Sequence, residues 1–236
     1  MLEEKGVITV SDLQMQAPNV SFTSGNFGGS SLSIRGIGRL VTASSADSGV
    51  SIHLNEIPYG TNLNTNEFFD VARVEVLRGP QGTLFGQNAT GGTLNIVTEM
   101  PDYSDVGGFV DIEAGDYGHA RVKGALNIPM GDSMGLRIAA MKLDRDGYVE
   151  NKAAESISTL DGSRISGIDY DIDGRDIQAY RVTWSWDPIE NSNFWVMYNY
   201  IEEESDRSRI SNQVCRQTAL PTLGCEPDQF LSLIHI

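Results

Sequence analysis

Basic charge, long apolar runs and cysteine are all scarce in this sequence. Its 236 residues hold 17 Lys and Arg against 32 Asp and Glu, a formal net charge of −15. Nucleic-acid binding requires clustered Lys and Arg that neutralise phosphates, and no such cluster is present, so nucleic acid is not a predicted partner. The same balance argues against a basic patch that would dock on anionic lipid headgroups.

No apolar run approaches the roughly 20 residues that a membrane-spanning helix needs. A secretory signal is also missing, because MLEEKGVITV opens with acidic residues and contains only a short apolar run. Either the protein is not exported, or the natural N-terminus lies upstream of this sequence.

The two cysteines, Cys215 and Cys225, are too few for a disulfide-stapled scaffold, and two ligands alone are too few for a metal site. They lie in a polar stretch with several Pro and Gly residues. In a reducing compartment both would be free thiols, whereas in an exported protein we expect one small loop disulfide between them.

Catalytic machinery is absent as well. The three histidines, His53, His119 and His235, have no nucleophile partner, and nothing resembles a nucleophile elbow or a zinc motif. DYDIDG at 169–174 matches the first half of a calcium loop, but Tyr180 stands where that loop needs a bidentate Glu. We therefore predict no enzyme activity, no cofactor and no metal site, and an acidic solvated loop at 169–174.

Residues 1–101 contain short apolar segments between polar stretches rich in Gly, Ser, Thr and Asn. VARVEVL at 71–77 and LNIV at 94–97 predict strands, and SDLQMQAP predicts a short helix that is capped at Ser11 and ends at Pro18. The pattern predicts a small mixed domain of short strands, one or two short helices and long polar loops.

Residues 102–236 contain longer segments in which apolar and polar residues alternate. The predicted strands are 107–115, 119–128, 134–143, 176–186 and 193–201. Strands of about 9–11 residues with one apolar face are typical of an outer-membrane barrel, but a soluble β-sandwich alternates as well. The connections favour the barrel, because short turns alternate with a long polar stretch at about 145–175.

The most specific stretch is VARVEVLRGPQGTLFGQNATGGTLNIVT at 71–98. A nucleotide loop is excluded because no G-K-[ST] is present to bring a lysine to a phosphate. The stretch resembles the plug signature of TonB-dependent receptors, roughly V-E-V-L-R-G-P-x-G-x-L-Y-G-x-x-x-x-G-G-x-I-N-I-V-T. LSIRGIG at 32–38 resembles the I-R-G motif of the same plug. In 50–58 the family's V-x-V-D-G-V-P has Asn55-Glu56 in place of D-G, which argues against a sharp turn there.

The resemblance implies a mainly β fold: a small α+β plug domain, residues 1–101, and then an open antiparallel sheet, residues 102–236, that is an incomplete part of a barrel of about 22 strands. It also implies that Arg35 and Arg78, in the I-R-G and L-R-G-P motifs, contact the barrel by pairing with glutamates on its wall. The alternative is that both arginines only cap turns at the domain surface.

In this family, plug loops that rise toward the outside contact the ligand. Here these loops are about 38–48 and 59–66, and the predicted ligand-binding residues are Arg39, Ser44, Ser45, Tyr59, Asn62 and Asn64. The mixture suits a polar chelate, with one cation for an anionic cargo. The alternative is that both loops are solvated and bind nothing.

The resemblance implies active uptake of a scarce nutrient across the outer membrane of a Gram-negative bacterium, in contact with its lipid and driven through the partner TonB. An iron–siderophore complex, a small-molecule metal chelate, is the default cargo by analogy. Cobalamin or a glycan is the alternative cargo, and a soluble extracellular β-rich binding module is the alternative class. A passive porin is excluded because a passive pore has no use for a plug of this size.

We expect the chain to be a piece of such a receptor. The TonB-contacting box and an early strand of the family are missing, so we expect an N-terminally incomplete plug with an exposed sheet edge and no coupling to TonB. Five predicted strands are far fewer than about 22, and LSLIHI at 231–236 lacks the usual terminal strand, so we expect a C-terminally truncated barrel. The loop with Cys215 and Cys225 should lie on the same side of the sheet as residues 145–175.

Overall fold

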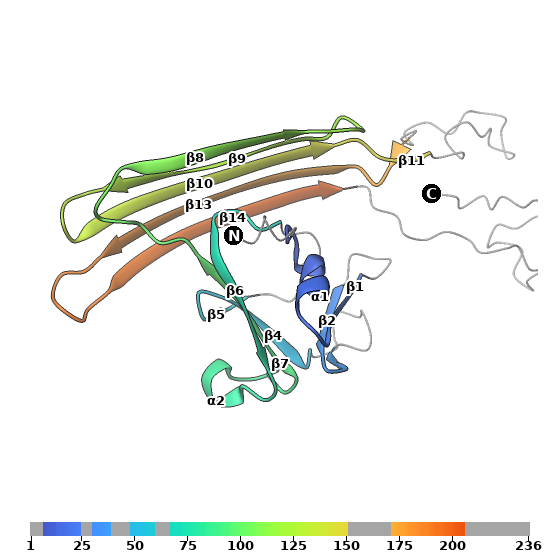
Figure 1. The fold of residues 1–236 in the computed structure, drawn as a ribbon, viewed down its shortest axis with the longest axis horizontal. Coiled ribbons are helices and arrows are strands. Elements are labelled where there is room, and N and C mark those ends of the chain that lie inside the picture. The colour runs from blue at the N-terminus through green and yellow to red at the C-terminus, as the bar shows by residue number, and fades with distance from the viewer. Residues whose placement is uncertain (1–6, 25–29, 39–47, 60–66, 151–170, 206–236) are drawn as a thin grey trace, which may run out of the picture. The chain divides into compact units, whose positions relative to one another are not determined.

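The protein is built mainly of strands, as the sequence predicts (Figure 1). The computed structural model describes residues 7–24, 30–38, 48–59, 67–150 and 171–205. These divide into two compact units. One contains the plug elements with 107–110, 123–141 and 180–200, and the other contains 111–122, 142–150, 171–179 and 201–205. In the part of the chain that the structure describes, no helix is long and apolar enough to cross a membrane.

Two small sheets form the plug. The first has the order β1-β2-β3, with β1 (Val20–Ser24), β2 (Ser30–Ile34) and β3 (Ile37–Gly38). The second has the order β5-β4-β7-β6, with β4 (Val50–Leu54), β5 (Ile57–Pro58), β6 (Val71–Arg78) and β7 (Gly92–Thr98). Within it β4 runs parallel to β7, and β6 runs antiparallel to β7. The strands predicted at 71–77 and 94–97 are therefore confirmed as β6 and β7.

The helical turn near the start of the described chain begins earlier than predicted. A 3-10 helix (Val10–Asp12) leads into α1 (Leu13–Gln16), and the residue before the first helical turn is Thr9, so the prediction of Ser11 as the cap is wrong. The Asp12 carboxylate accepts hydrogen bonds from the backbone N–H and the hydroxyl of Thr9, at 2.7 and 2.9 Å. This reciprocal capping arrangement fixes the start of the helix at Thr9.

One apolar cluster holds the plug together. Its fully buried members include Ile34 from β2, Val50 from β4 and Leu94 from β7, with Val10 from the 3-10 helix. These side chains come from both small sheets and from the helical turn, so their burial from water joins the elements into one core.

A sharp turn joins β4 to β5, contrary to the expectation for Asn55-Glu56. Both residues have left-handed backbone angles, with φ of 49° and 68°. Two consecutive residues of this kind form the tight hairpin turn, and Asn tolerates the conformation well. The Asn55 side chain also accepts a hydrogen bond from the Thr98 backbone N–H at 2.9 Å, which fastens the turn to β7.

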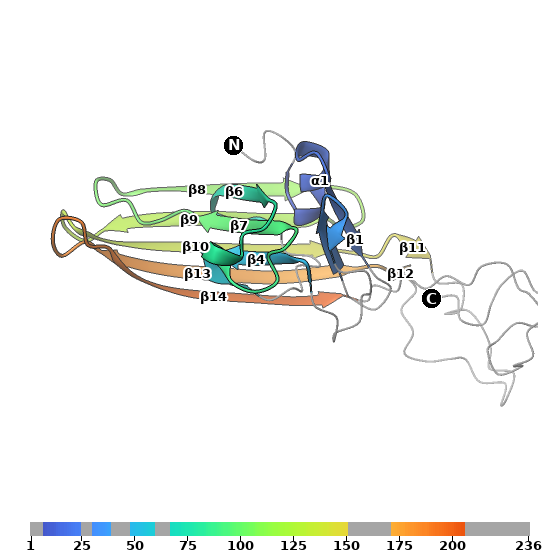
Figure 2. The same ribbon diagram turned by 90° about the horizontal axis from the view of Figure 1, so that it is seen from below.

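Among the described residues, five long strands follow the plug, in the number and positions predicted. They are β8 (Gly107–Ala114), β9 (Ala120–Pro129), β10 (Met134–Arg145), β13 (Arg175–Trp186) and β14 (Phe194–Ser205). We call them the wall strands. Their order is β14-β13-β10-β9-β8, and arrows of neighbouring strands run in opposite directions (Figures 1 and 2). Sequence analysis missed one small pair, in which β11 (Val149–Glu150) lies antiparallel to β12 (Asp171–Ile172).

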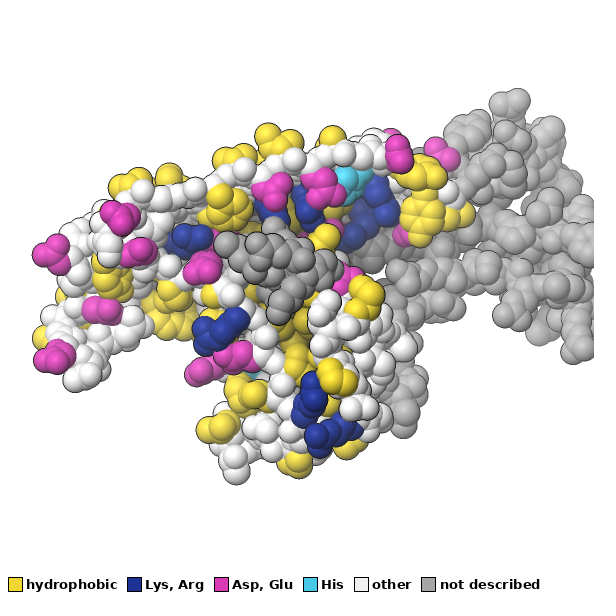
Figure 3. Space-filling model, viewed as in Figure 1, with side chains coloured by type: hydrophobic (Ala, Val, Ile, Leu, Met, Phe, Trp, Pro, Cys, Tyr) yellow, Lys and Arg dark blue, Asp and Glu magenta, His cyan; other side chains and the backbone are white. Residues whose placement is uncertain are grey.

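In β9 and along residues 180–186 of β13, the exposed face is apolar and the buried face is mostly polar. In β13, Arg181, Thr183 and Ser185 are buried, and the exposed residues between and beside them include Tyr180 and Trp186. Figure 3 shows hydrophobic side chains projecting along these strands. A soluble sandwich buries its apolar face, so this inverted pattern favours strands that face lipid. Aromatic rings meet on the exposed face, where Tyr180 stacks on Tyr200 at 4.7 Å between ring centroids.

We predict that Gly92→Ala destabilises the plug. Gly92 has φ of 151°, and a Cβ there would lie 2.4 Å from the Leu77 carbonyl oxygen. Such backbone strain is worth about 1–3 kcal/mol, so the free energy of unfolding should fall by that amount in urea titrations of the full chain in detergent. Gly82→Ala is the matched control, because a Cβ at Gly82 meets no atom within 4 Å. Equal stability of the two variants would contradict the prediction.

Candidate functional site

The segment before β6 is the point where the plug is fastened to the wall strands. Its residues Glu67, Phe68, Phe69 and Asp70 are all buried. The Phe68 N–H donates to the Ile8 carbonyl at 2.8 Å, which ties the segment to the start of the described chain. Asp70 has a left-handed backbone with φ of 51°, and its carbonyl accepts a hydrogen bond from the N–H of Glu99, the residue after β7.

The Asp70 carboxylate forms a two-pronged ion pair with Arg137 of β10. The Nε atom of Arg137 donates to both carboxylate oxygens, at 2.8 and 3.1 Å, and the Nη2 atom donates to one of them. The side chain of Asp70 is 3% exposed and that of Arg137 is 15% exposed, so the pair is largely removed from water. Fork geometry of this kind fixes orientation as well as charge.

Arg181 of β13 holds the backbone of the same segment. Its Nη1 atom donates to the carbonyl oxygens of Phe69 and Asp70, at 3.3 and 3.1 Å. Its Nε atom donates to the side-chain oxygen of Asn199 in β14 at 3.1 Å. The guanidinium carbon also lies 4.5 Å from the centre of the Phe69 ring, a cation–π contact. Arg181 therefore joins two wall strands to the plug.

Two asparagines add further contacts between plug-side segments and the wall strands. The Asn127 amide of β9 donates to the carbonyls of Asp102 and Asp105, at 2.8 and 2.7 Å, and its oxygen accepts from the Asp102 N–H at 2.9 Å. The Asn55 amide donates to the sulfur of Met197 in β14 at 3.7 Å. Together with the Asp70 contacts, these bonds hold the β4–β5 turn, the segment before β6 and the segment after Pro101.

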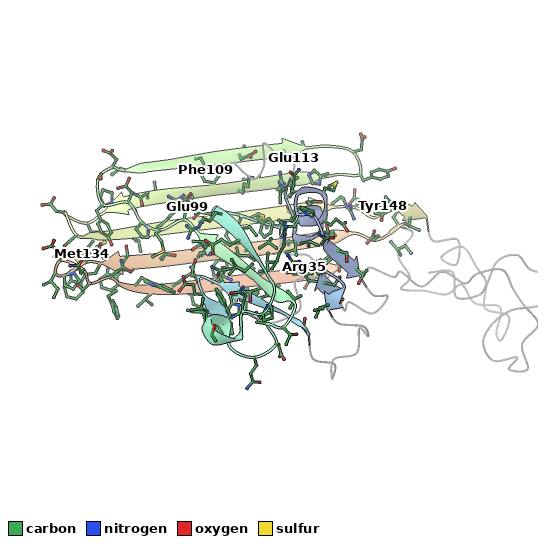
Figure 4. The ribbon with its side chains drawn as sticks, turned by 60° about the horizontal axis from the view of Figure 1, so that its bottom comes forward. Arg35, Glu99, Phe109, Glu113, Met134 and Tyr148 are labelled. Atoms are coloured by element: carbon green, nitrogen blue, oxygen red, sulfur yellow. The ribbon has the colours of Figure 1, made fainter. Side chains whose placement is uncertain are left out.

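The two arginines predicted to contact the wall are both exposed. Arg35 lies in the turn between β2 and β3, where its φ is 54° and its N–H donates to the Asn19 carbonyl at 2.8 Å (Figure 4). Arg78 ends β6. Within the described residues neither guanidinium forms an ion pair, and their pairing with wall glutamates stays a prediction.

Of the predicted ligand residues, Tyr59 is described by the structure. It is half-buried, packs against the apolar cluster of the plug, and its N–H donates to the Ile52 carbonyl at 2.8 Å. The others, Arg39, Ser44, Ser45, Asn62 and Asn64, lie outside the described residues. So do Cys215 and Cys225, so their disulfide and the position of their loop also stay predictions.

The residues that build this junction were missed by sequence analysis. One signal was present in the sequence, because Arg181 lies on the polar face of a strand whose other face is aromatic. An arginine that is buried on such a face needs a hydrogen-bond acceptor. Nothing local identified the acceptor, since the Asp70 carbonyl that Arg181 binds lies 111 positions away in the sequence. Among the described residues no three His, Cys, Asp or Glu side chains gather as a metal site. The junction positions one domain against a wall of strands.

Comparison with known proteins agrees with this architecture. Residues 1–93 match the family model described as TonB-dependent Receptor Plug Domain. Pesticin receptors of Yersinia enterocolitica and Yersinia pestis are 34% identical to the chain over 173 residues, which cover 70% of this chain and 24% of each relative. The chain thus spans about a quarter of the length of these curated relatives.

Solved structures give the same result for the fold. The ferric yersiniabactin uptake receptor FyuA from Yersinia pestis has a TM-score of 0.63 and 26% identity, over 85% of this chain and 30% of that one. The pyoverdine outer membrane receptor FpvA from Pseudomonas aeruginosa has a TM-score of 0.63 over 84% of this chain and 26% of that one. With 17% identity, the second likeness shows the fold alone.

We predict that Asp70→Ala strongly destabilises the protein. Removing one partner of a buried ion pair leaves an uncompensated charge, which lowers the free energy of unfolding by about 3–5 kcal/mol. Arg73→Ala is the control, because the Arg73 side chain is 62% exposed and its bond to Glu75 should be worth less than about 1 kcal/mol. Urea unfolding of the full chain in detergent measures both. A loss at Asp70 no larger than at Arg73 would show that the pair does not hold the plug.

Proposed function

The chain belongs to the TonB-dependent receptors, and from this premise we propose that the receptor of which it forms part actively takes up a ferric siderophore. Transport occurs across the outer membrane of a Gram-negative bacterium. The observation that carries the proposal is the buried attachment of a plug domain to wall strands through Asp70, Arg137 and Arg181. A passive pore gains nothing from a plug that is fastened in this way.

The choice of cargo is supported by relatives whose cargo their own descriptions give. The FyuA structure, at 26% identity, is that of a ferric yersiniabactin uptake receptor. A ferric siderophore is a polar chelate, and many carry negative charge that a guanidinium recognises well. In our proposal Arg39 supplies this cation, and Ser44, Ser45, Tyr59, Asn62 and Asn64 supply polar contacts.

TonB is the proposed partner of the whole receptor, and Arg35 and Arg78 are the proposed contacts between its plug and the glutamates of its complete wall. Both arginines are exposed in the described part of the chain, so they are accessible to such partners. The inverted wall strands, with apolar side chains outside, support a membrane location over the soluble binding module.

We predict that Arg39→Ala with Tyr59→Ala weakens ligand binding in the intact receptor. Loss of one charge-assisted hydrogen bond is worth about 1.5–3 kcal/mol, so the dissociation constant for ferric siderophore should rise roughly 10- to 100-fold. Radioactive iron uptake and equilibrium binding in iron-starved cells measure the effect. Arg73→Ala is the matched control, an exposed plug arginine outside the proposed ligand loops.

Two results would count against the proposal in different ways. Unchanged affinity in the double variant, with uptake intact, would show that the assigned residues do not bind the ligand, and the proposed cargo would stand. Uptake of cobalamin or a glycan by the unaltered receptor, with no uptake of any ferric siderophore, would show that the proposed cargo is wrong.

A further inference from the structure

One face of the four-stranded plug sheet carries a buried polar layer. The face toward the apolar cluster holds Val50, Ile52 and Leu94, whereas Ser51, His53, Thr93 and Asn95 alternate with these residues and are also buried. Within the layer, the hydroxyls of Ser51 and Thr93 bond at 2.8 Å. The Asn95 amide donates to the Glu75 carboxylate at 2.9 Å, and its oxygen accepts from the Glu56 N–H at 3.0 Å.

His53 is the member of this layer with an unsatisfied atom. The residue is 1% exposed, and its ring lies edge-on to the Phe85 ring at 4.8 Å between centroids. The imidazole donates a hydrogen bond to the Phe85 carbonyl. Its Nδ1 atom is buried and has no hydrogen-bond partner. The bond to Phe85 therefore comes from Nε2, which in this tautomer of the neutral ring carries the proton.

Phe85 belongs to a short flap that contacts the polar layer through His53. The flap is the segment 79–91, which contains α2 (Gly82–Phe85). Two backbone hydrogen bonds close its base, from the Gly79 N–H to the Gly91 carbonyl at 3.0 Å and from the Gln81 N–H to the Ala89 carbonyl at 2.9 Å. Gly79 and Gly86 have φ of 93° and 74°, so glycines with left-handed backbone stand at the base and directly after the helix.

We propose that the flap is a proton-sensitive latch, in which neutral His53 holds Phe85 on the sheet and protonation of its Nδ1 atom releases it. A second proton would place an N–H donor and a full charge in a buried position that offers no acceptor. Once the flap opens, water solvates the imidazolium. Protonation therefore favours the open flap, in which the His53 ring is exposed to water.

Burial lowers the pKa of His53 below its ordinary value, against a smaller opposing effect of the bond to Phe85. The closed state thus binds fewer protons than the open state. Closure is fully favoured above the ordinary pKa of about 6.5 and is lost as the pH falls from there toward the lower pKa of the closed state. Between these limits the population of the open flap rises about tenfold for each unit by which the pH falls.

In this pH range the change of charge is assigned to His53 and not to the titratable groups around it. β5, β7 and α2, the elements adjacent to it, carry no titratable side chain. β6 brings Arg73, Glu75 and Arg78, and hydrogen bonds from Asn95 and Arg73 lower the pKa of Glu75 below its ordinary value. Glu56, in the β4–β5 turn, is exposed.

The test is hydrogen exchange of the full chain in detergent micelles from about pH 7.5 to about pH 5, corrected for the intrinsic exchange rate. We expect the opening constant of amides in 79–91 to rise up to about 30-fold over this range, while amides of β6 and β7 change little. His53→Gln keeps a donor for the Phe85 carbonyl but does not titrate, so its flap should open equally at every pH. His119→Gln is the matched control and should behave as the unaltered protein.

A pH-independent flap in the unaltered protein would overturn the proposal, as would a pH response that survives in His53→Gln or disappears in His119→Gln. If His53→Gln fails to fold, the ring resonances of isotope-labelled histidine decide. A His53 resonance that titrates below about 6.5, together with flap opening, supports the latch. Titration at or above that value contradicts it.

Discussion

A buried charge must be paired, and the junction between plug and wall strands depends on that constraint. The Asp70 carboxylate is nearly sealed from water, so it requires the fork of Arg137, and the buried Arg181 requires the carbonyls of Phe69 and Asp70. Each group would be strongly destabilising alone. Because the acid comes from the plug and the bases come from two wall strands, satisfying the charges places the segment before β6 against β10 and β13.

Amide side chains also join segments that are distant in sequence at other points of the molecule. Asn55, Asn95 and Asn127 each donate and accept at once, and each joins backbone or side-chain groups that are distant in sequence. An amide offers both functions without carrying charge, so it satisfies buried backbone groups and needs no counter-ion. The plug combines an apolar core on one side of its larger sheet with a polar layer on the other.

The fold could be predicted from sequence where the signal was local. Alternation along 176–186 and 193–201 marks wall strands because each strand repeats its pattern over many residues, and the glycine-rich signature at 71–98 marks the plug. The β11–β12 pair was missed because its strands have two residues each and lie far apart in sequence. The turn at Asn55-Glu56 was misjudged because a non-glycine residue in the second position adopts a left-handed backbone, with hydrogen bonds to β7 and Asn95 holding it there.

The junction could not be predicted, because the sequence shows only that a polar residue faces inward and not what it meets. Arg181 bonds a carbonyl that lies 111 positions away, and no periodicity relates the two. Sequence motifs pointed instead to Arg35 and Arg78, whose role depends on glutamates of the complete wall. Local pattern thus defined the elements, while their long-range charge pairing became visible only in three dimensions.

The left-handed backbone of Asp70 limits which amino acids evolution can place there. A φ of 51° is adopted most readily by Gly, Asn and Asp. Of these three, only Asp carries the negative charge that Arg137 needs. A glutamate would keep the charge but adopts this conformation less readily, although Glu56 does so at φ of 68°, and an asparagine would keep the conformation but lose the charge. The backbone and the charge requirement together therefore favour aspartate at this position.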